Sequence, residues 1–178
     1  MDCLLIRHGI AVEPEDWEGE EENRPLTEKG KKRVLQAAAG LVALNCKPTH
    51  LLSSPLIRAY DTARLLRSVA CPSLKIETRE DLAVGSSPEK VVALLRSLPA
   101  ESMAWCVGHE PLLGEVAGLI LCGKATAGFA LKKAGAAYLR LPANFIPGQG
   151  SLRWWLQPMQ LRTLGKGKPK GMDRDRTD

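Results

Sequence analysis

The 178-residue sequence has few of the residues from which metal and redox sites are usually built. Its three histidines occur at no spacing such as HxxxH or HxxE that would bring two metal ligands together, and its five cysteines form no CxxC pair. We therefore expect no catalytic metal, no structural zinc and no cofactor. An odd number of cysteines among apolar neighbours is instead typical of buried, reduced thiols in a cytoplasmic protein.

Long hydrophobic runs are also missing. The N-terminus, MDCLLIRHG, offers only about four apolar residues before a charge, which is too short for a signal peptide or a membrane span. The segment GLILCGKA at 118–125 approaches a nucleotide-binding phosphate loop, but Ala125 stands where that loop needs a hydroxyl that binds magnesium. We expect a soluble, cytoplasmic protein with no membrane partner and no nucleotide loop.

Charge of each sign is concentrated in one segment. The formal net charge is +5, and residues 161–178 carry an excess of lysine and arginine within a glycine-containing stretch of low hydrophobicity. This composition predicts one folded domain at 1–160 followed by a disordered, solvated tail, with no nucleic-acid partner. Seven acidic residues occupy the ten positions 13–22. Such a run is most simply a solvated loop, although it can also guide a basic protein partner.

Short β-like runs alternate with amphipathic helices, an order that favours a mainly parallel sheet covered on both faces. In the first helix Val34, Ala38, Leu41 and Val42 recur at helical spacing, and Thr27 is the expected N-cap. We predict an α/β fold, a three-layer α/β/α sandwich around a mainly parallel six-stranded sheet with an antiparallel edge strand. Strands are expected at 2–7, 49–54, 74–78, 103–109, 136–141 and 151–157, and helices at 27–44, 55–70, 88–98 and from about residue 110.

Polar residues follow three of these strands directly. Arg7-His8-Gly9 ends the first strand, Ser53-Ser54-Pro55 with Arg58 follows the second, and Gly108-His109-Glu110 follows the fourth. In open α/β sheets ligands bind beyond the carboxyl ends of the strands, so two histidines and two arginines should converge there on one anion. A neutral histidine can accept a phosphoryl group, while guanidinium groups hold its oxygens. His50 belongs to no such motif and is expected to be structural or exposed.

The motifs LLIRHGIA, RPLTEKGKKR, LLSSPLIRAYDTA and WCVGHEPLLGEV resemble, in order and spacing, the histidine phosphatase (phosphoglycerate mutase-like) superfamily. With GAAYLRL and GSLRWWLQP the resemblance covers nearly all of residues 2–158, and it is greatest to the short SixA-type phosphohistidine phosphatases. It implies that His8 is the nucleophile that becomes phosphorylated and that Arg7 and Arg58 bind the phosphate. It also implies that His109 hydrogen-bonds the transferring group and that Gly9 contributes to substrate binding.

Larger members of the superfamily use an acidic residue after the third strand to protonate an alcohol leaving group. TREDLAVGSS offers Glu80 and Asp81 there, and Asp81 aligns better because a leucine follows it. A phosphohistidine has a labile N–P bond and can be cleaved with a weak acid or none.

The resemblance therefore implies a hydrolase that removes phosphate from phosphohistidine in proteins such as histidine phosphotransfer domains, with inorganic phosphate as product. We expect the protein to be a monomer. Two alternatives stay open. One is a small-molecule phosphomonoesterase of the same superfamily, and the other is a non-catalytic module that binds phosphorylated proteins.

Overall fold

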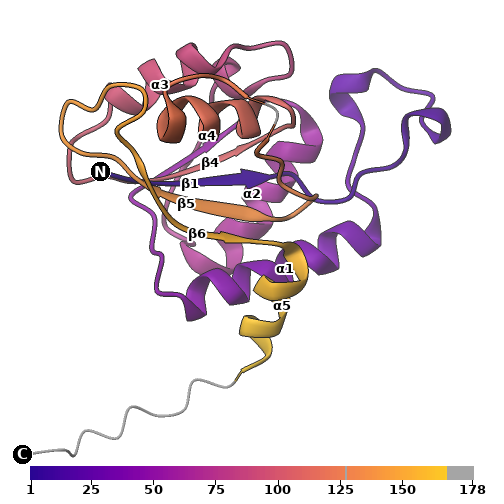
Figure 1. Ribbon diagram of the computed structural model, residues 1–178. Helices are drawn as coiled ribbons and strands as arrows, with labels where there is room; N and C mark the ends of the chain where they lie inside the picture. The colour runs from indigo at the N-terminus through magenta and orange to yellow at the C-terminus, as the bar shows by residue number, and fades with distance from the viewer. Residues whose placement is uncertain (127, 168–178) are drawn as a thin grey trace, which may run out of the picture.

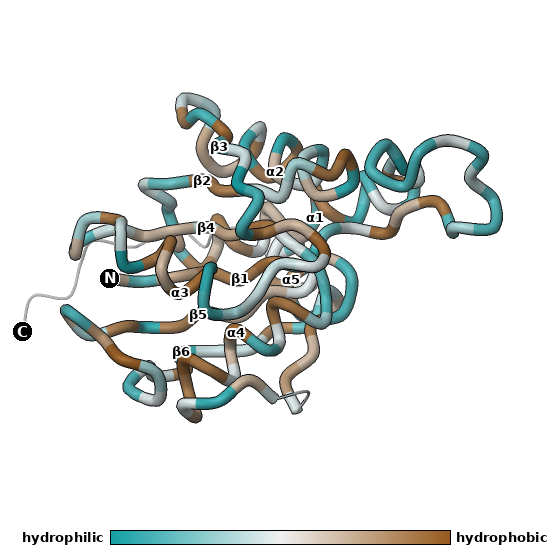
Figure 2. The backbone as a smooth tube through the Cα atoms, turned by 90° about the horizontal axis from the view of Figure 1, so that it is seen from above, coloured by the Kyte–Doolittle hydropathy of each residue, from teal (hydrophilic) through white to brown (hydrophobic). Residues whose placement is uncertain are grey.

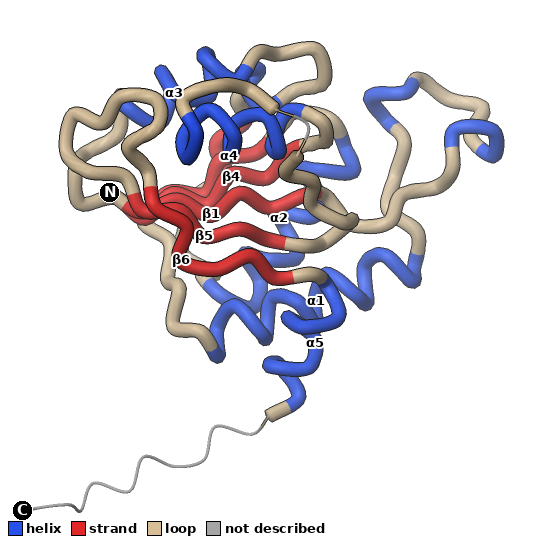
Figure 3. Tube along the Cα trace, in the orientation of Figure 1, coloured by secondary structure: helices blue, strands red, loops and turns tan. Residues whose placement is uncertain are grey.

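Six strands form one sheet that has helices on both faces (Figures 1 and 3). The structure is a computed structural model and describes residues 1–126 and 128–167. The strands are β1 (Asp2–Arg7), β2 (His50–Ser53), β3 (Ile76–Thr78), β4 (Met103–Gly108), β5 (Ala136–Arg140) and β6 (Ser151–Leu156). The α-helices are α1 (Glu28–Ala43), α2 (Ile57–Ala70), α3 (Pro88–Arg96), α4 (Leu112–Cys122) and α5 (Pro158–Lys166), and the short 3-10 helices are η1 (Pro14–Asp16), η2 (Glu21–Asn23) and η3 (Glu80–Leu82).

The strand order is β3-β2-β4-β1-β5-β6, with β1 and β4 in the middle of the sheet. All neighbouring pairs from β3 to β1 are parallel, whereas β5 is antiparallel to both β1 and β6. The predicted fold class is confirmed, but the antiparallel strand is one position in from the edge, which β6 occupies. After α4 the chain returns to the carboxyl end of β1, where Ala134 N–H donates to the Arg7 carbonyl. It therefore enters the sheet from that end, in the direction opposite to β1.

Two hydrophobic layers fill the space between the sheet and the helices. Cys3 and Leu5 of β1 pack with α3 and α4, whereas Leu4 and Ile6 pack with α1, α2 and α5 on the other face. Figure 3 shows α3 and α4 on one side of the sheet and α1 and α5 on the other. A strand buried on both faces needs a continuous apolar run, which explains the sequence CLLI.

The predicted end of the folded domain at residue 160 is wrong, because helix α5 continues to Lys166. Residues 161–166, assigned to the tail from their composition, belong to a helix that packs on α1, with Leu161 buried. The two backbones approach closely because Gly40 has no side chain, and a Cβ there would lie 2.1 Å from the Leu161 carbonyl oxygen. The rest of the predicted tail, 168–178, lies outside the described residues.

Two smaller expectations are also wrong. Val42, placed on the apolar face of α1, is 48% exposed, because the face of α1 that packs in the core is formed by residues such as Val34, Ala38 and Leu41. Cys122 is exposed because it is the last residue of α4, whereas the other four cysteines are buried. Thr27 is the N-cap of α1 as expected, since its side chain accepts from Gly30 N–H.

The segment between β1 and α1 projects from the body of the molecule and contains η1 and η2 (Figure 1). Hydrophilic residues dominate this excursion, in contrast to the apolar sheet (Figure 2). Its base is held by a two-residue bridge between Ala11 and Leu26. Among residues 1–126 and 128–167, no helix is long and apolar enough to span a membrane.

Candidate active site

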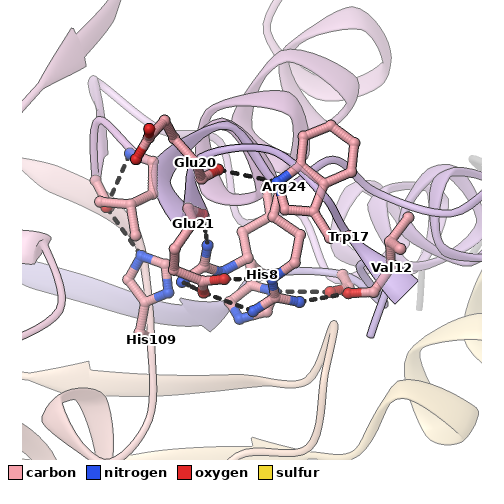
Figure 4. Close-up of polar contacts among 11 residues, drawn as sticks. His8, Val12, Trp17, Glu20, Glu21, Arg24 and His109 are labelled. Atoms are coloured by element: carbon pink, nitrogen blue, oxygen red, sulfur yellow. Dashed lines mark hydrogen bonds and ion pairs between the residues drawn. The ribbon is translucent and has the colours of Figure 1, made fainter. Parts of the chain in front are cut away.

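The carboxyl ends of β1 and β4 bring two histidines together. His8 follows β1 and His109 follows β4, and because these strands are adjacent and in register the ring centroids lie 5.0 Å apart. Both side chains are buried, with 7% of His8 and 3% of His109 exposed. Figure 4 shows both rings beside residues of the projecting segment, Glu21 and Arg24. The predicted convergence of the strand ends is therefore present in the fold.

Main-chain contacts fix the ring of His8. Its Nδ1 lies 2.7 Å from the carbonyl oxygen of Gly9, and the backbone N–H of His8 donates to the carbonyl oxygen of Gly108 at 3.0 Å. A carbonyl oxygen can only accept, so Nδ1 carries the proton and Nε2 carries the lone pair. The free nitrogen of a neutral imidazole is a nucleophile, and the fold holds it in one orientation.

His109 is oriented by Ser54, which follows β2. The His109 Nε2 and Ser54 Oγ atoms are 2.9 Å apart, and both residues are buried. Burial, followed by the charge of His109, lowers the pKa of His8 to about 3. Burial, followed by the charges of Arg58 and Arg7, lowers the pKa of His109 to about 3 as well. Both rings are therefore neutral at physiological pH when no anion is bound.

Two guanidinium groups complete the cluster, and each is anchored at its outer end. Arg58, in the first turn of α2, donates from Nη1 to the Glu21 carbonyl at 3.0 Å, and Arg7 donates from Nη1 to the Leu131 carbonyl at 2.8 Å. The Nε atom of each arginine is buried and has no hydrogen-bond partner among the described residues. Buried donors are nearly always paired, so these two N–H groups indicate a site for an oxyanion.

Glu110 supports Arg7 through the loop that precedes β5. Its carboxylate accepts from Leu131 N–H at 2.8 Å and from Gly114 N–H at 3.1 Å, while the Leu131 carbonyl accepts from Arg7. Burial raises the pKa of Glu110, although the two N–H groups and Arg7 act in the opposite direction. The carboxylate thus fixes a loop whose backbone orients an arginine of the site.

Gly9 has a packing role in the structure. A Cβ at this position would lie 2.7 Å from Val34 Cγ2 and 3.2 Å from Leu26 Cδ2, so a side chain would collide with α1 and the segment before it. The Gly9 N–H already donates to Thr62 Oγ1 at 3.0 Å, and Thr62 in turn donates to the Arg58 carbonyl. The backbone N–H of Gly9 is therefore not free to bind a substrate, as the expected role of Gly9 would require.

The two acidic residues expected near the site lie in η3, which passes the end of β4. A Cβ on Gly108 would be 3.3 Å from the Leu82 carbonyl oxygen, which shows how close this turn is to the site. Asp81 is half-buried and Glu80 is exposed, and neither side chain forms a hydrogen bond or ion pair within the described part of the chain. His50 is at the start of β2, at the opposite end of the sheet, beside Thr49 Oγ1.

Reasoning from the sequence missed several side chains of this cluster. Glu21 forms ion pairs with both Arg24 and Arg58, so the acidic segment is not simply a solvated loop. Lys133 also pairs with Glu13 of that segment at 3.2 Å. Arg24 begins the quoted motif RPLTEKGKKR, and Ser54 stands at one of the polar strand ends, so both had a signal in the sequence. Glu21 had none beyond its place in the acidic run.

No group of three or more His, Cys, Asp and Glu side chains in the described ranges, 1–126 and 128–167, is arranged to hold a metal ion. Two surface hollows of about 460 and 490 Å³ lie near Met1, beyond the amino end of β1 and away from the histidines. Neither hollow is lined by His8, His109, Arg7 or Arg58.

Comparison with known proteins relates the chain to one family. A model of the histidine phosphatase superfamily (branch 1) matches residues 3–83. An uncharacterized protein of Picosynechococcus sp. is 35% identical over 148 residues, which span 82% of this chain and 88% of that protein.

Solved structures share the fold. The protein histidine phosphatase SixA, complexed with tungstate, superposes with a TM-score of 0.79 at 23% identity, covering 90% of this chain and 99% of SixA. A mutant phosphoserine phosphatase from Entamoeba histolytica, in complex with phosphoserine, superposes with a TM-score of 0.66 at 16% identity, covering 90% and 98%. At these identities the structural matches establish the shared architecture only.

Proposed function

The chain belongs to branch 1 of the histidine phosphatase superfamily and is a phosphatase of that superfamily, and on this premise we propose that it works through a phosphohistidine formed on His8. The observation that supports this most strongly is the neutral His8, with its lone pair on Nε2, together with the buried Nε–H groups of Arg7 and Arg58, which have no hydrogen-bond partner among residues 1–126 and 128–167. Tungstate, the oxyanion bound by SixA, is a mimic of the group that such a cluster would hold.

In the first step, the lone pair of His8 Nε2 attacks phosphorus in line with the leaving group. The new N–P bond forms as the bond to the leaving group breaks, and the electron pair of that bond departs with the leaving group. Arg7 and Arg58 neutralise the charge of the phosphoryl oxygens, and His109 donates a hydrogen bond to one of them. The Gly9 carbonyl stabilises the resulting imidazolium, because it accepts from Nδ1–H.

In the second step, water attacks phosphorus from the position that the leaving group has vacated. The N–P electron pair returns to His8 Nε2, and the proton lost by water passes to the phosphate that is released. Ser54 keeps the ring of His109 in place through both steps, because its hydroxyl contacts His109 Nε2 at 2.9 Å. No group beyond those of the chain and water enters this scheme.

We propose phosphohistidine in a protein, such as a histidine phosphotransfer domain, as the substrate. Its leaving imidazole needs no strong acid, which agrees with an Asp81 that no hydrogen bond or ion pair fixes within the described residues. The likeness to SixA also supports this choice, because SixA is described as a protein histidine phosphatase.

The test is to trap the intermediate. Wild type incubated briefly with a phosphohistidine peptide is expected to carry phosphate that is labile in acid and stable in base, and His8→Ala is expected to carry none. Hydrolysis by His8→Ala should fall by about a thousandfold or more, as for other covalent nucleophiles. His50→Ala is the matched control, since His50 lies at the far end of the sheet and should retain both properties. Full hydrolysis by His8→Ala contradicts the mechanism.

The likeness to phosphoserine phosphatase supports a second candidate, a small-molecule phosphomonoesterase. An alcohol leaves poorly without a proton, so this activity requires a carboxylic acid such as Asp81, which η3 places near the end of β4. Hydrolysis of sugar phosphates or phosphoglycerates that is lost in Asp81→Asn would decide for it. Tight phosphate binding without any turnover would instead indicate a binding module.

A further inference from the structure

Glu21 brings a carboxylate to the mouth of the site. Its Oε1 atom lies 3.2 Å from Arg58 Nη2, and Arg24 binds both carboxylate oxygens, with Nε to Oε2 and Nη2 to Oε1 each at 2.7 Å. The Glu21 carbonyl also accepts from Arg58 Nη1. Both the side chain and the backbone of Glu21 are thus fixed beside a guanidinium group of the proposed phosphate site.

This carboxylate is accessible as well as fixed. The Glu21 side chain is 53% exposed, whereas the Arg58 side chain beneath it is 4% exposed. Hydrogen bonding by Arg24 lowers the pKa of Glu21, so the Glu21 carboxylate stays ionised at neutral pH. The charge of this carboxylate also acts on His109, whose pKa it raises against the larger effect of burial. A substrate whose phosphoryl group lies between the histidines and Arg58 therefore places its leaving group near an ionised carboxylate that is paired with Arg24 and Arg58 and can accept a further hydrogen bond.

We propose that Glu21 is a specificity-determining residue that favours leaving groups carrying a cationic N–H donor and disfavours leaving groups carrying a carboxylate. The inference rests on the proposed function and deepens it, because it assigns the choice between phosphoramidate and phosphoester substrates to one side chain. The preferred substrate class is a phosphoryl group on an imidazole nitrogen.

The chemistry of this leaving group explains the preference. A phosphoimidazole protonated on the nitrogen remote from phosphorus donates that N–H to the Glu21 carboxylate. When His8 Nε2 attacks, the N–P electron pair stays on the substrate nitrogen, and a neutral imidazole leaves with its remote proton in place. Glu21 stabilises the protonated, reactive form, as the Gly9 carbonyl does for phosphorylated His8. No proton has to be supplied by an acid.

Phosphorylated hydroxy acids and amino acids are disfavoured beside the Glu21 carboxylate. Their carboxylate has no N–H to donate to the Glu21 carboxylate, and two ionised carboxylates in contact repel each other. Their alkoxide leaving group needs a proton, which an ionised Glu21 does not provide. The same carboxylate thus favours one substrate class and opposes the other.

The test compares kcat/KM for a phosphohistidine peptide with kcat/KM for 3-phosphoglycerate in wild type, Glu21→Gln and Glu18→Gln. The glutamine is nearly isosteric, removes the charge and replaces one acceptor oxygen by an NH2 donor. Glu18 is the matched control, since it belongs to the same acidic segment and forms no hydrogen bond or ion pair within the described residues. Folding of each variant is checked by circular dichroism, and Glu21→Ala, which also removes the charge, serves if Glu21→Gln does not fold.

We expect Glu21→Gln to reduce the ratio of the two kcat/KM values, peptide over phosphoglycerate, by about tenfold, and Glu18→Gln to leave it within about twofold. An equal loss on both substrates overturns the inference, because Glu21 would then act only by positioning Arg58. A wild type that prefers 3-phosphoglycerate overturns it too. Failure of the proposed function looks different, since wild type would form no phosphohistidine or His8→Ala would stay active.

Discussion

Lowering the pH from 7 to 5 is expected to destabilise this protein by about 4 kcal/mol, because two buried histidines stay neutral in the folded state. The pKa of each falls from the ordinary value of 6.5 to about 3 in the fold. As the pH drops below 6.5 the unfolded chain takes up protons that the folded chain does not bind. At pH 5 this difference amounts to about 2 kcal/mol for each histidine. Stability is therefore full above pH 6.5 and is lost progressively towards pH 3.

The assay is urea unfolding at pH 7 and pH 5 in buffers free of phosphate, followed by tryptophan fluorescence, since Trp105 is fully buried. The variants are His8→Asn, His109→Asn and the double substitution, none of which can titrate at these positions. Each single variant should lose about half of the pH dependence, and the double variant nearly all of it. The pKa values of Glu21 and Glu110 shift in opposite directions, and both carboxylates are present in every variant, so differences between the variants report the histidines.

The comparison between pH values removes the direct effect of each substitution on folding. A loss below about 1 kcal/mol in wild type would refute the reasoning, because the histidines would then titrate in the fold much as in the unfolded chain. An unchanged loss in the double variant would refute it equally.

Two further predictions concern residues around the histidines. Ser54→Ala removes the partner of His109 Nε2, so kcat on a phosphohistidine peptide should fall about tenfold while KM changes less. Ser54→Thr should restore part of the rate. Equal activity of Ser54→Ala and wild type would contradict this role. Gly9→Ala places a Cβ 2.7 Å from Val34 Cγ2, so the free energy of unfolding measured in urea should fall by about 1–3 kcal/mol. Adding Val34→Ala should partly relieve this loss. An unchanged free energy of unfolding in Gly9→Ala would show that α1 moves away freely.

The main elements of the fold followed from local patterns. The CLLI run of β1 and the apolar run of β4 predict strands buried on both faces, and the spacing in α1 with Thr27 as its cap predicts a helix. Boundaries were less well predicted where burial depends on a distant partner. Helix α5 is the example: its composition suggests a solvated tail, but Leu161 is buried against α1 because Gly40 allows the two backbones to touch.

The sequence by itself determined which residues stand at the carboxyl ends of the parallel strands. An apolar run that stops at Arg7-His8, or at His109, must place those polar groups at the edge of the sheet, because each would be costly within the core. Parallel strands then bring such ends together.

Only the tertiary structure decided that Glu21 contacts Arg58, which is 37 positions away along the chain, and that Ser54 orients His109 across 55 positions. The path of the projecting segment and the pairing of β2 with β4 set these distances. Neither depends on a local pattern, since a glutamate in an acidic run and a serine after a strand have the same propensities wherever the chain folds them.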